Sequence, residues 1–460
     1  MGKEFCGVSF GNVADFRFVK AMDECLEKKS KKYFLWKKLI DYEKRIKFTN
    51  NNVLHNLKRF ERKWKALNNR YRQINLYGIE FVGIGETISR LFMYMSDKKQ
   101  RNKDILYLVL PTFYSYYTAG IVNKKIFEVF RKEVHFVTEN NFFFWKYVLM
   151  VHSDKVSIDY FDTYKYRGKP ERFEIEIGKP LLSFSDRIEK YAKEKMREME
   201  VSGTYICLHA REVATKINNF GDTYEVQADT SILDFDVNTF GSACAYIKDL
   251  GFQAVRMGKD ESKKCNIKCV IDYANDYYDE LMDFYLIANC KFLIGCSSGI
   301  TAIAAFWGRP VLQTNTVGFC FGLESLPWTK YDMYLPKKFY SKRKKRFLNL
   351  FEMMNASYKC DRYKMRYDKD EIELIDNTEE EILYATIEMN EKIDHTWVQT
   401  VEEKQYMDKY WKILDKWKDQ HRVAYESIER GGKGYVFYTR SISYSYLKDN
   451  LYLLDVKESV

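Results

Sequence analysis

The stretch NCKFLIGCSSGITAIAAFWGRPVLQTN (residues 289–315) decides the fold class. Lys291 to Ile294 and Pro310 to Gln313 are short apolar runs typical of buried strands. Between them, Ile300 to Trp307 has the length of a helix that ends at Gly308. A strand, a turn, a helix and a second strand form the repeating unit of a parallel sheet, because parallel neighbours need a crossover connection.

The same alternation extends toward the N-terminus of this stretch. Further strand-like runs are Tyr205 to Leu208, Phe252 to Arg256 and Lys268 to Asp272. Helical patterns lie between them at Asn238 to Leu250, which Gly251 ends, and at Tyr277 to Asn289. We therefore predict a doubly wound, Rossmann-type domain over residues 196–335.

A second parallel-sheet domain is expected over residues 76–195. Leu76 to Gly85 predicts a strand that ends in a glycine-containing turn, and helical spacing follows it. Asp104 to Pro111 predicts the next strand. The predicted fold class is thus α/β, with two Rossmann-type parallel-sheet domains facing a cleft. A basic helical segment (1–75) precedes them, and a helical region (336–460) follows, with a capping box at Thr378 and Glu381.

Composition narrows the class of protein. A chain of 460 residues with 46% hydrophobic and 17% aromatic residues is globular and long enough for more than one core. Its 10 cysteines are scattered, several inside apolar runs, which is typical of reduced thiols. We find no apolar run long enough for a membrane span and no signal-peptide pattern, so we expect a cytoplasmic protein.

The charge is concentrated near the N-terminus. Between Lys28 and Arg72 there are 16 basic and 3 acidic residues, so this segment alone carries +13 in a chain whose total is +10. Leu57, Phe60 and Trp64 recur at helical spacing on an apolar stripe. One interpretation is a solvated helix packed on the next domain. The alternative is that this segment binds peripherally to an anionic membrane surface. Nucleic-acid binding is not expected, because no base-reading motif accompanies the charge.

Ligands of parallel sheets bind outside the carboxyl ends of the strands, so the residues that follow each strand are candidates for binding. Ser297, Ser298 and Gly299 open a helix directly after a strand, where exposed amides favour phosphate. An ordinary turn with a serine N-cap would look the same in sequence. Other candidates at this edge are His209, Arg211, Arg256, Gly258 and Asn315.

Arg211 has the planar fork that binds a diphosphate, although an ion pair with Glu212 or Asp222 would also explain it. The D-x-D formed by Asp234 and Asp236 offers a metal-dependent alternative, which we do not favour because the pattern is common by chance. Cys265 and Cys269 lack a second pair of zinc ligands nearby. We therefore predict no metal and no cofactor. For a catalytic base the sequence leaves Glu212, Asp222, Glu86 and His209 open.

Several motifs together carry a resemblance. YICLHARE (205–212), LGFQAVRMG (250–258), DELMDFYLIANCKFLIGCSSG (279–299) and GRPVLQTN (308–315) resemble a family of bacterial glycosyltransferases of surface-polysaccharide and related glycan assembly. The similarity also covers NTF (238–240), YLPKKFYSKRKKRFLNLFEM (334–353), ELIDNTEEEILYATIEMNE (373–391) and SISYSYLKDNLYLL (441–454). The family motif is usually H-x-R-D, whereas Glu212 follows Arg211 in this chain.

More distantly, H-x-R and S-S-G look like the donor diphosphate site of GDP-fucosyltransferase-type enzymes with the GT-B fold. The resemblance implies phosphate binding by Arg211, Ser297, Ser298 and Gly299, with His209 in support. It also implies a GT-B-like glycosyltransferase that moves a sugar from a nucleotide-sugar to a glycan, lipid-linked or protein acceptor without a metal. We list Arg211 and Glu212 as catalytic candidates. A non-catalytic nucleotide- or glycan-binding protein and a nucleotide-sugar epimerase remain alternatives.

Overall fold

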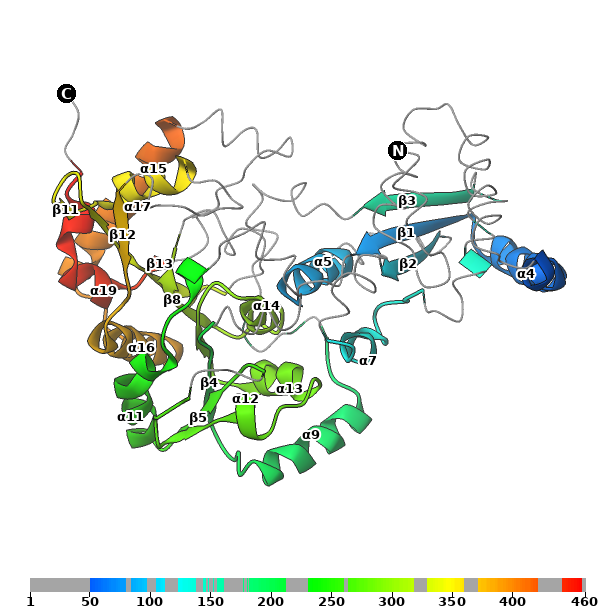
Figure 1. The fold of residues 1–460 in the computed structure, drawn as a ribbon, viewed down its shortest axis with the longest axis horizontal. Coiled ribbons are helices and arrows are strands. Elements are labelled where there is room, and N and C mark those ends of the chain that lie inside the picture. The colour runs from blue at the N-terminus through cyan, green and yellow to red at the C-terminus, as the bar shows by residue number, and fades with distance from the viewer. Residues whose placement is uncertain are drawn as a thin grey trace. The chain divides into compact units, whose positions relative to one another are not determined.

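The computed structural model describes residues 50–79, 84–96, 105–111, 123–137, 144–145, 148, 152, 155–160, 177, 180, 182–211, 231–259, 264–317, 329–359, 371–420 and 441–456. The chain divides into two compact units, Met1–Asp162 and Thr163–Val460 (Figure 1). Glu212 and Asp222 lie outside the described residues.

The first unit contains a three-stranded parallel sheet of order β2-β1-β3. Its strands are β1 (Gln73–Ile79), β2 (Ile105–Pro111) and β3 (Val156–Tyr160), and its helices are α4 (Asn50–Arg70), α5 (Ile84–Ser96) and α7 (Ile126–Phe130). Ile74 and Leu76 of β1 and Ile88 and Leu91 of α5 are fully buried. The predicted alternation of strands and helices is confirmed here, although β1 starts three residues earlier than expected and stops at Ile79.

A seven-stranded sheet forms the centre of the second unit, with the order β13-β9-β8-β7-β4-β5-β6 and every neighbouring pair parallel. The five predicted strands correspond to β4 (Tyr205–Leu208), β5 (Gln253–Arg256), β6 (Val270–Ile271), β7 (Leu293–Gly295) and β8 (Val311–Thr316). Two further strands, β9 (Met333–Pro336) and β13 (Ser441–Ile442), extend the sheet beyond β8. The predicted α/β class with parallel sheets is therefore confirmed.

Helices cover both faces of this sheet (Figure 1). Ile206 and Leu208 point into a core with α11 (Gly241–Asp249) and α16 (Glu379–Ile393). The alternate residues of β4, Tyr205 and Cys207, bond to the carbonyl of Leu286 in α13 (Met282–Asn289) on the other face. The two-residue period of the strand thus sorts its side chains between two helical layers. The remaining elements up to β8 are α9 (Asp186–Glu198), η5 (Ser231–Leu233), η6 (Val237–Phe240), α12 (Tyr273–Asp276) and α14 (Gly299–Phe306).

The residues after β9 contain helices and also a small antiparallel sheet of order β11-β10-β12. Residues 342–345 of the basic cluster form the turn between β10 (Lys338–Ser341) and β11 (Arg346–Phe347), and Arg346 begins β11. β12 (Ile372–Ile375) pairs with β10. The helices here are α15 (Leu350–Lys359), α16, α17 (Val401–Gln420), α19 (Tyr444–Asp449) and the short η8 (Leu451–Leu454). The predicted capping box is present, with Thr378 as the N-cap of α16 and Glu381 as its partner.

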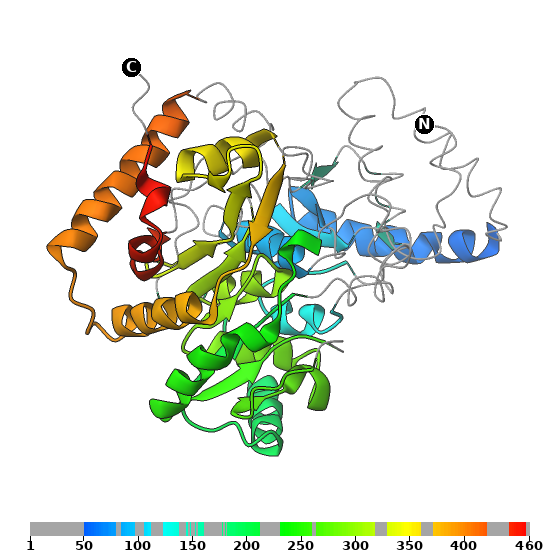
Figure 2. The ribbon, with the colours of Figure 1, turned by 60° about the vertical axis from the view of Figure 1, so that its left-hand side comes forward.

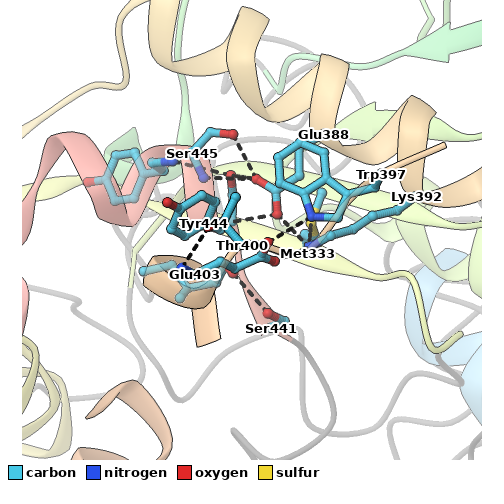
Figure 3. Close-up of polar contacts among 12 residues, drawn as sticks. Met333, Glu388, Lys392, Trp397, Thr400, Glu403, Ser441, Tyr444 and Ser445 are labelled. Atoms are coloured by element: carbon cyan, nitrogen blue, oxygen red, sulfur yellow. Dashed lines mark hydrogen bonds and ion pairs between the residues drawn. The ribbon is translucent and has the colours of Figure 1, made fainter. Parts of the chain in front are cut away.

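A buried carboxylate fastens the C-terminal segment to the unit (Figure 3). Glu388 of α16 is fully buried and accepts hydrogen bonds from the Ser443 hydroxyl (2.7 Å) and the Tyr444 amide (3.1 Å). It also accepts from the amide and the hydroxyl of Ser445, both at 2.9 Å. Lys392 completes the arrangement at 2.6 Å. The carboxylate thus lies at the first turn of α19, and α16, α17 and α19 run close together (Figure 2).

Among the helices of the described residues, none combines the length and the apolar character that a membrane crossing requires. No disulfide joins cysteines within the described part of the chain, and Cys207, Cys290 and Cys296 are buried.

Candidate functional site

The order of the large sheet contains a switch point between β4 and β7. The chain builds β4, β5 and β6 toward one edge, then returns to place β7 on the other side of β4 and continues outward with β8 and β9. In open parallel sheets, ligands bind at such a switch point, outside the carboxyl ends of the two strands. His209 follows β4, and Cys296 to Gly299 follow β7.

His209 lies at this switch point and is held on both ring nitrogens. Its backbone amide continues the sheet by donating to the Ile294 carbonyl at 2.9 Å. Nδ1 lies 3.1 Å from the Met257 carbonyl oxygen, and Nε2 lies 3.0 Å from the Ser298 hydroxyl. Because a carbonyl oxygen only accepts, Nδ1 carries a proton. In the neutral ring, Nε2 then accepts the hydroxyl proton of Ser298.

The turn between β7 and α14 is fixed by two threonines. Thr314 of β8 donates to the Gly295 carbonyl at 3.1 Å, and Thr301 of α14 donates to the Cys296 carbonyl at 2.8 Å. Ser298 is the N-cap residue of α14, yet its side chain makes no capping hydrogen bond. Its hydroxyl is bonded to His209 instead. The Thr301 amide donates to the Ser298 carbonyl at 3.1 Å. The Gly299 and Ile300 amides have no serine side-chain oxygen as acceptor and are suited to an anion.

Arg211 follows His209 by two residues, and its side chain is 5% exposed. Its guanidinium lies 3.6 Å from Oδ1 of Asp234. The sequence suggested Glu212 or Asp222 as the ion-pair partner of Arg211, and both lie outside the described residues. Asp234 belongs to the D-x-D motif, for which the sequence suggested metal binding. In the structure this carboxylate faces the Arg211 guanidinium instead and orients it at this edge of the sheet.

Lys337 is a second cation of this edge, and the sequence analysis did not identify it. It directly follows β9, and its ammonium is 3.1 Å from the Asp234 carbonyl oxygen and 2.6 Å from Oδ1 of Asp376. The same rule that identified Arg211, a basic residue at the carboxyl end of a strand, would have found it if β9 had been predicted. Lys337 thus holds the segment that carries the partner of Arg211.

Asn315 lies at a bulge near the end of β8, in the left-handed region with φ 53°. It forms a reciprocal pair with Asn377: each side-chain oxygen accepts the other residue's amide, at 2.6 and 2.7 Å. The Asn315 Nδ2 group is buried and has no hydrogen-bond partner among the residues that the structure describes. A buried donor without an acceptor costs about 1–3 kcal/mol, so it is a group that a ligand could satisfy.

Arg256 and Gly258 follow β5 on the other side of the switch point. The Arg256 side chain is 1% exposed and donates to Oδ2 of Asp272 at 3.0 Å. Gly258 is buried and has φ 149°, a value that favours glycine. Arg256 is thus placed in a buried ion pair at the end of β5, and the structure brings His209, rather than Arg256, into contact with the S-S-G turn.

The two carboxylates of the D-x-D motif serve different contacts. Asp234 faces Arg211, whereas Asp236 caps η6 by accepting from the Asn238 amide at 2.9 Å. Among the described residues, no group of three or more histidine, cysteine or acidic side chains is gathered as a metal site. Cys265 and Cys269 are half-buried, and burial raises the pKa of the Cys265 thiol. Glu86 belongs to α5, and its side chain is outside those described.

No protein-family model matches the chain, and no curated protein matches it. Several solved structures are similar to the chain. The chain is similar to a glycosyl transferase family 9 structure from Veillonella parvula, with 12% identity over 70% of this chain and 97% of that chain and a TM-score of 0.36. It is also similar to E. coli ADP-heptose lipopolysaccharide heptosyltransferase II (13% identity, 52% and 84% covered, TM-score 0.30). A third is S. aureus MnaA with UDP (11% identity, 53% and 79% covered, TM-score 0.25). Because these TM-scores are below 0.5, function is inferred below from the residues of the site.

Proposed function

We propose that the second unit binds the diphosphate of a nucleotide-sugar and that the protein is a glycosyltransferase. The observation that carries the proposal is the His209–Ser298 contact, which joins the carboxyl ends of β4 and β7 at the switch point of the sheet. Ser298 is the N-cap residue of α14 and does not cap it with its side chain, and Arg211 follows His209 by two residues at the end of β4, beside Asp234. Amides at a helix start and an arginine fork are the groups that bind phosphate oxygens.

In the transfer itself, these groups would act on the leaving nucleoside diphosphate. Arg211 and the α14 amides favour negative charge, so they stabilise the diphosphate more as its bond to the sugar breaks. The buried Nδ2 of Asn315 supplies one further donor at the same edge. Lys337 keeps Asp234 in place and thereby helps to orient Arg211. Glu212 stays our candidate for the base that activates the acceptor.

The finer proposal is an enzyme of bacterial surface-glycan synthesis that needs no metal for donor binding. It follows from the motifs quoted above and from Arg211, which can neutralise phosphate without a divalent ion. The first unit would then bind a glycan, lipid-linked or protein acceptor.

Thermal shift with GDP, UDP, CDP, CMP and dTDP tests the donor site, each with Mg²⁺ or with EDTA. A ligand at about 100 times its Kd stabilises a protein by about 2.7 kcal/mol, which raises its Tm by a few degrees. We expect one nucleotide to stabilise the protein equally with EDTA and with Mg²⁺. The Arg211→Ala variant should lose this shift. Stabilisation that depends on Mg²⁺ and survives in Arg211→Ala would instead favour a site at Asp234 and Asp236.

Release of nucleoside diphosphate from the matching nucleotide-sugar then tests for transfer. A glycosyltransferase releases it faster when an acceptor glycan is present. An epimerase needs no acceptor and returns an epimeric nucleotide-sugar, because only a stereocentre of the sugar changes. A non-catalytic binding protein leaves the nucleotide-sugar unchanged. Nucleotide binding with no release under any acceptor would contradict the enzymatic part of the proposal.

We also propose that the basic helix α4 associates with an anionic membrane surface by charge alone. Trp64 is buried and stacks on His152 at 4.5 Å, and Phe60 contacts Phe144, so the apolar stripe packs within the first unit. Exposed basic residues remain on the other side of the helix, namely Arg59, Arg62, Lys65 and Arg70. Near such a surface each contributes about 1 kcal/mol, and salt screens the attraction.

Flotation with liposomes tests this association. We expect binding to vesicles that contain phosphatidylglycerol at low salt, none to neutral vesicles, and release at high salt. The double variant Arg62→Glu with Lys65→Glu should lose binding without a change in Tm. Failure of the unaltered protein to float with anionic vesicles at low salt would contradict the proposal.

A further inference from the structure

We propose that His209 and Ser298 form a proton relay, in which anion binding at the first turn of α14 protonates His209 and the histidine then supplies a proton to the departing diphosphate. The inference rests on the proposed donor site and adds to it the source of a proton. The two side chains are already in contact between the ends of β4 and β7, so the relay requires no rearrangement of these strands.

The relay follows from counting protons along three atoms. Nδ1 of His209 faces the Met257 carbonyl at 3.1 Å and therefore keeps its proton in both charge states of the ring. Nε2 faces the Ser298 hydroxyl at 3.0 Å. With a neutral ring, the single hydroxyl proton of Ser298 is donated to Nε2. Ser298 then has lone pairs, but no proton, to offer to a ligand.

A phosphate oxygen at the α14 turn requires the opposite polarity. To donate to that oxygen, Ser298 must turn its proton away from His209. Two lone pairs would then face each other across 3.0 Å unless Nε2 takes up a proton from solvent. Once it does, the protonated ring donates to Ser298, and Ser298 donates to the phosphate. Anion binding and protonation of His209 therefore favour each other.

The charged groups nearest to the pair in the described residues are largely compensated. Arg211, two residues after His209, lies beside Asp234, and on β5 Arg256 is paired with Asp272. Lys259, after β5, places its ammonium over the Tyr278 ring, and α14 contains no charged residue. The positive end of α14 disfavours a positive charge on His209 before a ligand binds, and a bound diphosphate favours it.

During transfer two protons move: one from Ser298 to the departing diphosphate, and one from His209 to Ser298. The bond between the sugar carbon and the diphosphate oxygen breaks, and its electron pair stays on that oxygen. The Ser298 proton passes to the oxygen, the Nε2 proton of His209 passes to Ser298, and the ring returns to its neutral form. No oxidant, reductant or metal takes part in this step.

The proton taken up on binding can be measured directly. Isothermal titration of the full-length protein with GDP, and in parallel with UDP, is repeated at pH 7 in buffers of different ionisation enthalpy. If binding raises the pKa of a histidine from about 6.5 to about 7.5, roughly half a proton is taken up at pH 7. We expect the unaltered protein to take up about that much more than His209→Asn or Ser298→Ala.

The variants separate the relay from a structural role. His209→Asn keeps a donor near the Met257 carbonyl but removes the atom that faces Ser298, and Ser298→Ala removes the far end of the relay without touching the histidine. Ser298→Thr keeps the hydroxyl and should restore the proton uptake. Equal proton uptake in all four proteins, with the nucleotide still bound, would overturn the relay and leave the proposed donor site intact. If GDP, UDP, CDP, CMP and dTDP all fail to bind the unaltered protein, the donor site fails and the relay fails with it.

Discussion

The second unit holds two buried polar clusters that differ in how their charges are satisfied. Around Glu388, five donors lie between 2.6 and 3.1 Å from a carboxylate with no exposed surface. At the switch point, the Arg211–Asp234 contact is 3.6 Å, and the buried Nδ2 of Asn315 has no partner. The first cluster is closed by the chain itself. The second contains one buried donor, Nδ2 of Asn315, that a bound ligand could use.

This difference separates a stabilising role from a binding role. A closed network stabilises the fold because every charge is compensated when water is removed. A cluster with longer contacts and an unsatisfied donor costs folding free energy, and a bound anion would recover that cost. Burial of a charged group is therefore a poor guide to function by itself. What distinguishes the two clusters is how far their hydrogen bonds are completed by the protein.

The largest expected effect is at the closed cluster. Glu388→Ala removes the acceptor of the first α19 amides and leaves Lys392 with the longer contact to Glu403 at 3.6 Å, and removal of one partner from a buried ion pair costs about 3–5 kcal/mol. Urea titration followed by circular dichroism should show this loss in the free energy of unfolding. Glu380→Ala, an exposed change on the same helix, should stay within about 0.5 kcal/mol. A loss below about 1 kcal/mol for Glu388→Ala would mean that the cluster does not fasten the C-terminal segment.

The next effect is at the switch point and should appear in binding. Arg211→Ala removes charged hydrogen bonds worth about 1.5–3 kcal/mol, so the Kd for the stabilising nucleotide should rise about 10- to 150-fold. Isothermal titration measures it. Arg346→Ala removes an arginine paired with Glu352 in a surface turn and serves as the matched control, with an unchanged Kd. Equal effects of the two variants would indicate a loss of fold or of general charge.

A third effect concerns another closed contact, the capping box of α16. The Thr378 hydroxyl accepts the Glu381 amide at 3.2 Å, and Thr378→Ala should lower the free energy of unfolding by about 1 kcal/mol. Thr378→Ser keeps the hydroxyl and should stay close to the unaltered protein in the same urea titration. Because the box lies next to Asn377, a changed nucleotide affinity in Thr378→Ala would show that it also supports the Asn315 pair.

The smallest effect is expected at the surface pair of Glu352. Its hydrogen bonds with Arg346, and then with Lys344, lower the pKa of this carboxyl to about 2. Because the pKa in the folded state is below the unfolded value of about 4.3, the contribution is complete above pH 4.3 and is lost as the pH falls toward 2. At pH 7, Glu352→Gln should cost less than about 1 kcal/mol. Urea titrations at several pH values should show the difference from the unaltered protein closing between pH 4.3 and 2. A constant difference would contradict the assigned pKa.

Local sequence patterns were sufficient to predict most elements of the large sheet. Tyr205 to Leu208 was predicted as a strand with the bounds that β4 has, and the helix stops at Gly251 and Gly308 coincide with φ values of 75° and 64°. These features depend on residues close together in the chain, so periodicity and glycine reveal them. The strand β13 was not predicted because its two residues carry no readable period. The strand β9 was not predicted either, although its four residues are as many as those of β4.

The candidate site could be predicted from the sequence only in part. His209, Arg211, Ser298 and Asn315 could be named in advance because each follows a strand, and the carboxyl ends of parallel strands share one edge. Their partners could not. His209 meets Ser298 across 89 positions of sequence, and Asn315 meets Asn377 across 62. Asp234, considered from the sequence as a metal ligand, is the ion-pair partner of Arg211 in the structure, and Lys337 was identified only there.

The sequence by itself thus determined the α/β class, the helical and strand segments of residues 205–315, and the residues at the edge of the sheet. Only the tertiary structure decided that β7 lies beside β4, which creates the switch point and brings the histidine to the serine. The physical reason is range: helix and strand patterns arise from neighbours in the chain, whereas strand order depends on how distant segments bury their apolar faces against one another.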